Sequence, residues 1–152
     1  MQLKAILLLC CLLLSWYSGT TQHVHAQGNE EYILFHSLSL EKGKIYEAIF
    51  SPDNQSLLTL ANTNKLEIWA AKSGKRQRLI ATGKHNAVSV IFHPTDPVLI
   101  TGGQDKTIQL WDIVKATTMD VLRGHIGDVE TLAITLKGDY LVSGSKDGAV
   151  II

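Results

Sequence analysis

Cysteine is almost missing from this chain of 152 residues. Its two cysteines, Cys10 and Cys11, are adjacent and lie near the N-terminus, so the rest of the sequence can form neither disulfides nor cysteine-based zinc sites. A net charge is missing as well, because 14 basic side chains balance 14 acidic ones. A dedicated binder of nucleic acid or of an anionic membrane is expected to carry a basic excess, so this balance argues against both functions.

The most apolar stretch is Ala5–Tyr17, which contains one serine and no charge and follows Lys4. It is shorter than the ~20 residues of a membrane-spanning helix, but it suits the core of a secretory signal. Val24-His25-Ala26 places small or modest residues at the positions that a signal peptidase reads. We therefore expect residues 1–26 to be a signal peptide cleaved after Ala26, with an uncleaved anchor as the alternative.

This leader predicts export from the cytoplasm, to the medium, the periplasm or the cell surface. After cleavage we expect no stable membrane span. His23 and His25 have the spacing of a metal handle. Because they belong to the part that is expected to be removed, we predict no metal site from them.

The body of the chain repeats itself every 42 residues. Trp69 and Trp111 are 42 positions apart, and the same offset aligns Phe50 with Phe92. The register continues without a gap from residue 50 to residue 152. Repeats with a period of about 20 to 50 residues are typical of solenoids, propellers and arrays.

Each repeat contains short runs with the character of strands, and the second repeat has four of them. In the second repeat these runs cover residues 87–92, 98–101, 107–111 and 117–122, and the turn-forming segments HPTDP and GGQDK separate the first three. Apolar residues do not recur at the helical spacings of three and four. Four short strands in about 42 residues is the pattern of a propeller blade.

Several segments resemble the WD-repeat β-propeller family. Leu99–Asp112 (LITGGQDKTIQLWD) is similar to the end of a WD-repeat blade, and Leu141–Ile152 is similar to the same motif without its Trp. Arg123–Val129 (RGHIGDV) is similar to the Gly-His start of a blade, and residues 83–88 are a weaker copy. The resemblance covers about residues 32–152. It implies an all-β fold, a partial β-propeller of four-stranded antiparallel blades that start near residues 44, 84 and 124.

The resemblance also implies a larger parent protein. In closed propellers of this family the N-terminal strand usually completes the last blade, so residues 32–40 (YILFHSLSL) are expected to form such a clasp strand. Seven blades of about 42 residues need about 294 residues. Residues 27–152 are therefore expected to be an incomplete propeller of about three blades, and the missing C-terminal blades would follow residue 152.

The family forms a hydrogen-bonded tetrad of His, Ser or Thr, Asp and Trp within each blade. Such a network suits a buried indole N–H, which needs an acceptor. The first repeat departs from the pattern, since it has Thr59 and Trp69 but carries Thr63 where Asp belongs and no His near Lys44. We expect it to be the looser blade. The matching positions are His85, Thr101, Asp105 and Trp111 in the second blade, and His125, Ser143 and Asp147 in the third.

Two kinds of catalytic site would use residue types that are also found at these tetrad positions. An Asp-His-Ser triad would need a pocket and an oxyanion hole, whereas here the hydroxyl would be tied into strand pairing. The S-x-x-K match at residues 143–146 lies between two strands, although in β-lactamase-like enzymes that motif opens a helix. No glycine-rich segment precedes a helix, which argues against a phosphate cradle. We expect no catalytic residue, no metal and no cofactor, and hence a protein that is not an enzyme.

The resemblance implies a non-catalytic scaffold for protein–protein contact. It places the ligand face at the turns that precede the first and third strands of each blade. The partner-binding candidates are then Asn86, Gln104, Asp128 and Lys146. The partners would be other proteins, and no nucleic acid, but the fold does not specify which ones. The alternative is a sensor or regulatory propeller attached to a catalytic domain beyond residue 152.

One basic run contains no acidic residue. It falls on the predicted outermost strand of the first blade and its flanks, where charge discourages edge-to-edge pairing. A polyanion-binding stripe is the alternative interpretation. The run consists of Lys72, Lys75, Arg76, Arg78 and Lys84. In the same blade, Asn54-Gln55-Ser56 fits a glycosylation sequon in a surface turn.

Overall fold

The computed structural model describes residues 23–25, 31–33 and 44–152. The chain divides into two compact units, Met1–Leu40 and Glu41–Ile152. In the first unit, β1 (His23–His25) pairs antiparallel with β2 (Glu31–Ile33). The apolar core of the predicted leader and residues 34–40 of the predicted clasp strand lie outside the described residues. Within the described ranges, no helix has the length and apolarity that crossing a bilayer would require.

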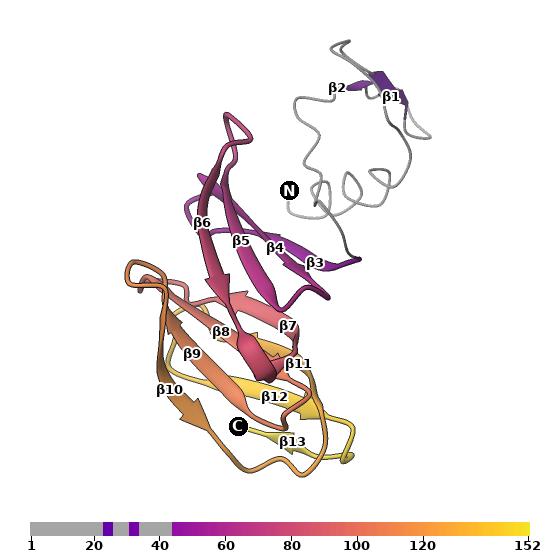
Figure 1. The fold of residues 1–152 in the computed structure, drawn as a ribbon, viewed down its shortest axis with the longest axis vertical. Helices are drawn as coiled ribbons and strands as arrows, with labels where there is room; N and C mark the ends of the chain where they lie inside the picture. Colours follow the sequence, from indigo (N-terminus) through magenta and orange to yellow (C-terminus); the bar gives the residue numbers. More distant parts are fainter. Residues whose placement is uncertain (1–22, 26–30, 34–43) are drawn as a thin grey trace. The chain divides into compact units, whose positions relative to one another are not determined.

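The second unit consists of three consecutive antiparallel sheets, which we call blades 1, 2 and 3 (Figure 1). In each blade every strand pairs with its neighbour in the sequence. Blade 1 contains β3 (Ile45–Phe50), β4 (Ser56–Ala61), β5 (Lys65–Ala70) and β6 (Arg76–Ala81). Blade 2 contains β7 (Ala87–Phe92), β8 (Val98–Gly103), β9 (Ile108–Asp112) and β10 (Thr117–Leu122). Blade 3 contains β11 (Val129–Ile134), β12 (Leu141–Ser145) and β13 (Val150–Ile151).

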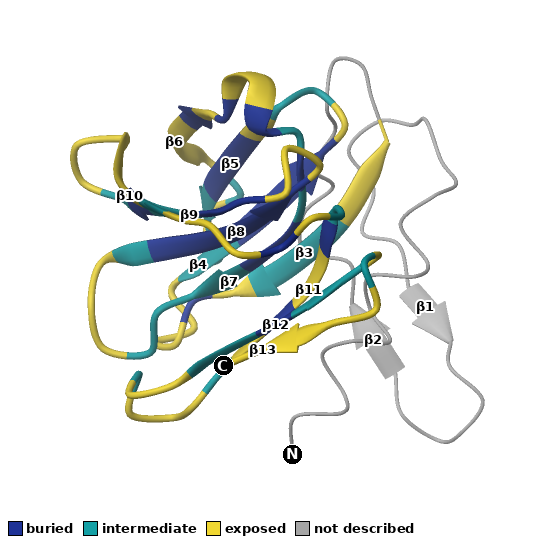
Figure 2. Cartoon of the chain, turned by 90° about the horizontal axis from the view of Figure 1, so that it is seen from below, coloured by how far each residue is buried: buried dark blue, intermediate teal, exposed yellow. Residues whose placement is uncertain are grey.

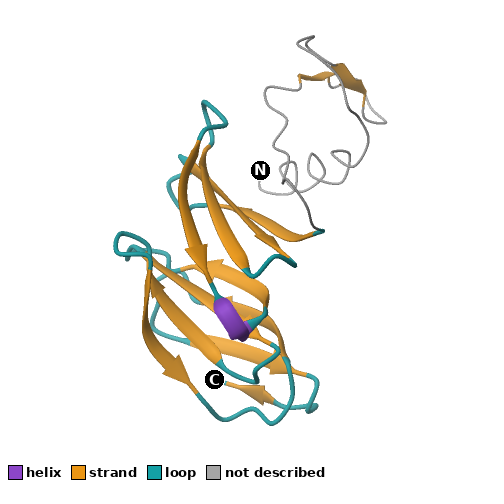
Figure 3. Ribbon diagram, viewed as in Figure 1, coloured by secondary structure: helices purple, strands orange, loops and turns teal. Residues whose placement is uncertain are grey.

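The prediction of an all-β chain with antiparallel propeller blades is confirmed. Figure 3 shows strands throughout the second unit, with a single short helical turn, η1 (Gly83–His85), between blades 1 and 2. Blades 1 and 2 have the four strands expected, and blade 3 has three. The blades begin at Ile45, Ala87 and Val129, which are 42 residues apart like the sequence repeat.

Irregular features of the backbone recur with the same period. The register shifts after the first residue of β3, β7 and β11, so that each inner strand begins with a bulge. The residues bulged are Tyr46, Val88 and Glu130, and a bulge re-aims the side chain that it carries. A left-handed residue also recurs in the hairpin between the second and third strands, at Asn64, Lys106 and Gly148. Only one of these three is glycine, so the turn geometry is kept while the residue changes.

Two apolar cores hold the blades together. Alternate residues of a strand point to opposite faces of its sheet, and neighbouring residues of β8 therefore belong to different cores. Leu99 packs with Leu58, Leu66 and Ile80 of blade 1. Ile100 packs with Val129 and Leu132 of blade 3. Figure 2 shows the result, since β8 is buried along most of its length whereas β13 is exposed.

Two polar contacts join blades 1 and 2 beside the first core. The Glu47 carboxylate of β3 accepts a hydrogen bond from the backbone N–H of Val90 in β7 (2.9 Å). Burial raises the pKa of Glu47, and that hydrogen bond lowers it in part. The Arg78 guanidinium of β6 donates to the carbonyl of Val114, after β9 (3.0 Å).

Candidate functional site

Blade 2 contains a closed network of four side chains. The Nδ1 atom of His85 lies 2.8 Å from Asp105, and its Nε2 atom lies 2.8 Å from the Thr101 hydroxyl. The Trp111 indole donates to the same hydroxyl (2.8 Å). Because a carboxylate only accepts, Nδ1 donates to Asp105. The network ties η1 to β8, β9 and the turn between them.

Blade 3 brings together the three residues of its partial set. The His125 ring lies 3.0 Å from Asp147 through Nδ1 and 2.9 Å from the Ser143 hydroxyl through Nε2. The backbone N–H groups of Ala149 and Ile126 also donate to the Asp147 carboxylate (both 2.8 Å). These hydrogen bonds, with that from His125, hold the pKa of Asp147 well below its usual range.

Blade 1 has the smallest set of these contacts. The Trp69 indole donates to the Thr59 hydroxyl (3.0 Å), as its counterpart does in blade 2. Thr63 stands where Asp belongs, and residue 43, at the position of the missing His, lies outside the described residues. At this position of the blade the backbone N–H of Lys44 instead donates to the Asn62 side chain (2.8 Å).

The hydroxyls of these sets are closed to a substrate. Thr101 is fully buried and Ser143 is 2% exposed, and each is already engaged by a histidine. A nucleophilic hydroxyl must reach a carbonyl carbon in an open site, which this arrangement does not offer. The geometry therefore suits a network that stabilises the blade, because a buried polar group must be hydrogen-bonded.

The four partner-binding candidates form two backbone-bonded pairs at one end of the blades. The N–H of Gln104 donates to the carbonyl of Asn86 (3.2 Å), and the N–H of Lys146 donates to that of Asp128 (2.9 Å). In each pair the first residue precedes an inner strand, and the second follows the next strand of the same blade. Both pairs therefore occupy the same place in consecutive blades.

Blade 1 contains a third pair that the sequence analysis missed. The N–H of Asn62 donates to the carbonyl of Lys44 (3.0 Å), and both residues lie 42 positions before Asn86 and Gln104. The repeat offset was the signal that points to them. We call the three pairs, Lys44/Asn62, Asn86/Gln104 and Asp128/Lys146, the rim.

The rim pair of blade 3 also carries an ion pair. The Lys146 ammonium lies 2.9 Å from the Asp128 carboxylate and 3.4 Å from that of Glu130, the bulged residue of β11. The hydrogen bond to Asp128 and its charge raise the pKa of Lys146. The two candidates are therefore not independent contact points, since a change at either one alters the other.

The basic run of the sequence does not form one continuous stripe. Arg76 of β6 pairs with Glu67 of β5 (3.5 Å), whereas Arg78 points toward blade 2, where it donates to the Val114 carbonyl. Lys84 lies in η1, beyond the far end of β6. β6 is the outer strand of blade 1, as predicted, so Arg76 and Arg78 do lie on a sheet edge.

Comparison with known proteins decides the nature of the repeats. Residues 75–112 and 116–152 match the WD40 family, described as WD domain, G-beta repeat. Each of these two segments matches one WD40 repeat. Each WD40 repeat begins with the outer strand of one blade and continues with the first three strands of the next, from β6 to β9 and from β10 to β13. The repeats therefore span the boundaries between blades.

Proteins similar to this chain are much longer than it is. Pre-mRNA-processing factor 19 of Bos taurus is 34% identical over 47% of this chain, which spans 15% of that protein. Striatin-3 of Bos taurus is 36% identical over 41% of this chain, which spans 9% of that protein. A solved structure, "Structure of U3-55K", superimposes with a TM-score of 0.68 at 20% identity, over 74% of this chain and 36% of that chain. This last likeness concerns the fold.

Proposed function

We propose that this protein is a non-catalytic protein-interaction module whose rim contacts its partner. The observation that carries the proposal is the recurrence of one loop pair, with at least one exposed member, in three consecutive blades at intervals of 42 residues. Beneath the rim, the WD40 repeats provide rigid sheets and the buried networks fix the loops. A partner that spans several blades would contact a different side-chain pair on each, and this gives the surface its specificity.

Charge reversal at the blade 3 pair tests this proposal, because the ion pair offers a matched control. Asp128→Lys and Lys146→Glu each place two like charges next to one another, whereas the double variant restores an ion pair with its polarity inverted. The purified chain is immobilised and used to capture proteins from its own host, with quantification by mass spectrometry. The captured amount of a protein that contacts the rim is expected to fall at least fivefold with both single variants and with the double variant.

The opposite end of the blades provides the comparison for this experiment. The variant Asp96→Asn/Lys137→Gln changes two exposed residues in hairpins away from the rim, and capture by it should equal that of the wild type. Circular dichroism spectra should agree for all variants. Equal capture by the wild type and by all the rim variants would contradict the proposal.

We further propose that the module is exported, on the strength of the leader features of residues 1–26. The apolar core, the preceding lysine and the small residue at Ala26 support this part of the proposal. Expression of the complete chain in its host, followed by N-terminal sequencing of the extracytoplasmic protein, is expected to give a chain that begins at Gln27. Recovery of the uncut chain in the cytoplasm would refute export and leave the interaction proposal standing.

A further inference from the structure

Four lysines lie at the rim end of blades 1 and 2. Lys44 precedes β3, Lys65 begins β5, Lys84 belongs to η1, and Lys106 occupies the hairpin between β8 and β9. All four are exposed. In the part of the chain that the structure describes, no carboxylate lies within ion-pair distance of any of them.

Backbone contacts place these lysines along one continuous path. Lys44 is bonded to Asn62, three residues before Lys65. Lys65 is the pairing partner of Ala81, three residues before Lys84. The next contact, between Asn86 and Gln104, leads to Lys106 two residues later. The path therefore crosses from blade 1 to blade 2 without leaving the rim end.

The nearby acids form no ion pair with these lysines, because their contacts go to other groups of the blades, although Asp105 is itself exposed. Glu47 accepts a hydrogen bond from the backbone N–H of Val90, and Glu67 forms an ion pair with Arg76. Asp105 accepts from His85 and from the side chains of Thr107 and Gln109. A chain with zero formal charge thus presents a basic surface over two blades.

Blade 3 ends the basic surface. At the position equivalent to Lys44 it carries Asp128, and Lys146 is held between Asp128 and Glu130. At the position equivalent to Lys84 it carries Ile126, which is 78% exposed. The sign of the exposed charge therefore changes between blades 2 and 3.

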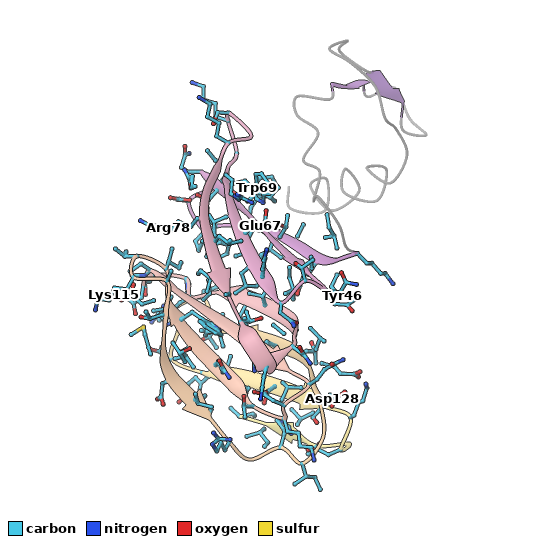
Figure 4. The ribbon with its side chains drawn as sticks, viewed as in Figure 1. Tyr46, Glu67, Trp69, Arg78, Lys115 and Asp128 are labelled. Carbon is cyan, nitrogen blue, oxygen red and sulfur yellow. The ribbon has the colours of Figure 1, made fainter. Side chains whose placement is uncertain are left out.

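An exposed aromatic residue lies near Lys44 in the sequence. Tyr46 is 48% exposed and is the bulged residue of β3, two positions after Lys44. Figure 4 shows Tyr46 and Asp128 at one end of the strands, with Arg78 and Lys115 at the other. A tyrosine beside flexible cations supplies the apolar anchor that protein interfaces use.

We propose that the rim end of blades 1 and 2 binds an extended peptide segment rich in Asp and Glu. Its carboxylates would pair with Lys44, Lys65, Lys84 and Lys106, and one apolar side chain would pack on Tyr46. This inference rests on the proposed function and names the chemistry of the partner. Electrostatic complementarity of this kind selects the partner and speeds its association more than it tightens the complex. A nucleic acid is disfavoured, because Asp128 and Glu130 continue the rim with acidic groups.

The test measures binding of a fluorescein-labelled dodecapeptide of Glu and Asp that contains one Leu, by fluorescence anisotropy. The reference probe is the same peptide with Gln and Asn in place of the acids. We expect the wild type to bind the acidic peptide at least tenfold more tightly than the reference. Raising the salt from 50 to 300 mM should weaken the binding at least fivefold, because the contacts are exposed ion pairs.

Variants with equal charge loss separate this surface from a general charge effect. Lys44→Gln/Lys65→Gln/Lys84→Gln/Lys106→Gln removes the four lysines at the rim end of blades 1 and 2, and we call it the rim variant. The control variant, Lys72→Gln/Lys75→Gln/Lys115→Gln/Lys137→Gln, removes four lysines from hairpins at the opposite end. The rim variant should lose at least tenfold in affinity, and the control should stay within twofold of the wild type. Tyr46→Ser should weaken binding of the Leu-containing peptide but not of an all-acidic one.

Three results would overturn the inference. They are the absence of acidic-peptide binding by the wild type, an equal loss in both quadruple variants, and tighter binding of a 12-nucleotide single-stranded DNA than of the peptide at equal salt. None of them affects the proposed function by itself. That proposal fails only if the Asp128 and Lys146 variants retain every protein that the wild type captures.

Discussion

Blades 1 and 2 share one apolar core but fix their loops in different ways. Both contribute leucines to the same interface, and both have a tryptophan that donates to a threonine. Blade 2 adds His85 and Asp105, which join η1 to the hairpin after β8. At this place of blade 1, the contact among the described residues is that between Lys44 and Asn62. The comparison shows that strand pairing and apolar burial suffice to form a blade, while the buried network fixes the loops at the rim.

Removal of His85 from blade 2 is expected to have the largest effect on stability, because it takes away the network that blade 1 lacks. His85→Ala removes one hydrogen bond each from the Asp105 carboxylate and the buried Thr101 hydroxyl and opens a cavity, so we expect a loss of about 3 kcal/mol in the free energy of unfolding. Urea denaturation measures it. His125→Ala in blade 3 removes a network that contains no indole among the described residues, and it should cost less. A cost below ~1 kcal/mol for His85→Ala would show that the network does not stabilise blade 2.

The Asp147 carboxylate makes the stability of blade 3 dependent on pH. Asp147 has a pKa well below its usual range because Ala149, Ile126 and His125 donate to it. Its ionised form therefore contributes stability above the ordinary carboxyl pKa of about 3.9, and this contribution is lost as the pH falls toward the lowered pKa.

Asp147→Asn should accordingly be less stable than the wild type at pH 7, and the difference should shrink below about pH 4. Urea midpoints at pH 7 and pH 3 measure it. Asp139→Asn, at an exposed position of the same blade, is the control and should change little at either pH. A difference for Asp147→Asn that is the same at both values would contradict the assignment.

The two tryptophans offer the smallest and most direct comparison of blades 1 and 2. Trp111 is 4% exposed and donates to a hydroxyl that also binds His85, whereas Trp69 is half-buried and its threonine has no such histidine contact among the described residues. Trp111→Phe should cost about 1 kcal/mol in unfolding free energy. Trp69→Phe should cost less, because water can compensate for part of the lost hydrogen bond. Equal costs would mean that the blade 2 network does not strengthen the indole contact.

Much of the fold could be predicted from the sequence because of its repeat period. Strand runs, turns and the positions of His85, Asp105 and Trp111 depend on residues close together within one unit, and the offset of 42 carries them from blade to blade. The three strands of blade 3 and the bounds of the elements followed the same pattern. By contrast, the clasp strand and the leader concern residues that are mostly outside the described ranges, and they stay predictions.

Contacts between strands and between blades could not be predicted from the sequence in the same way. The acceptor of Val90 is Glu47 in another blade, and nothing in either segment alone indicates that pairing. The ion pair of Lys146 with Asp128 depends on the register that brings β11 beside β12. Tyr46 is exposed because a bulge turns it, although its apolar neighbours suggested an ordinary strand residue. Such features arise from tertiary packing, which local sequence patterns do not encode.

The pairing of every blade strand with its sequence neighbour has a consequence for how this protein is made. Contacts within a blade close loops of only a few residues, and the contacts between blades join segments about one repeat apart. Local contacts of this kind favour rapid folding, and domains often begin to fold during synthesis. Blade 1 contains all its strands once Ala81 has left the ribosome, and it can then serve as the surface on which blade 2 condenses. The order of translation thereby becomes the order of assembly.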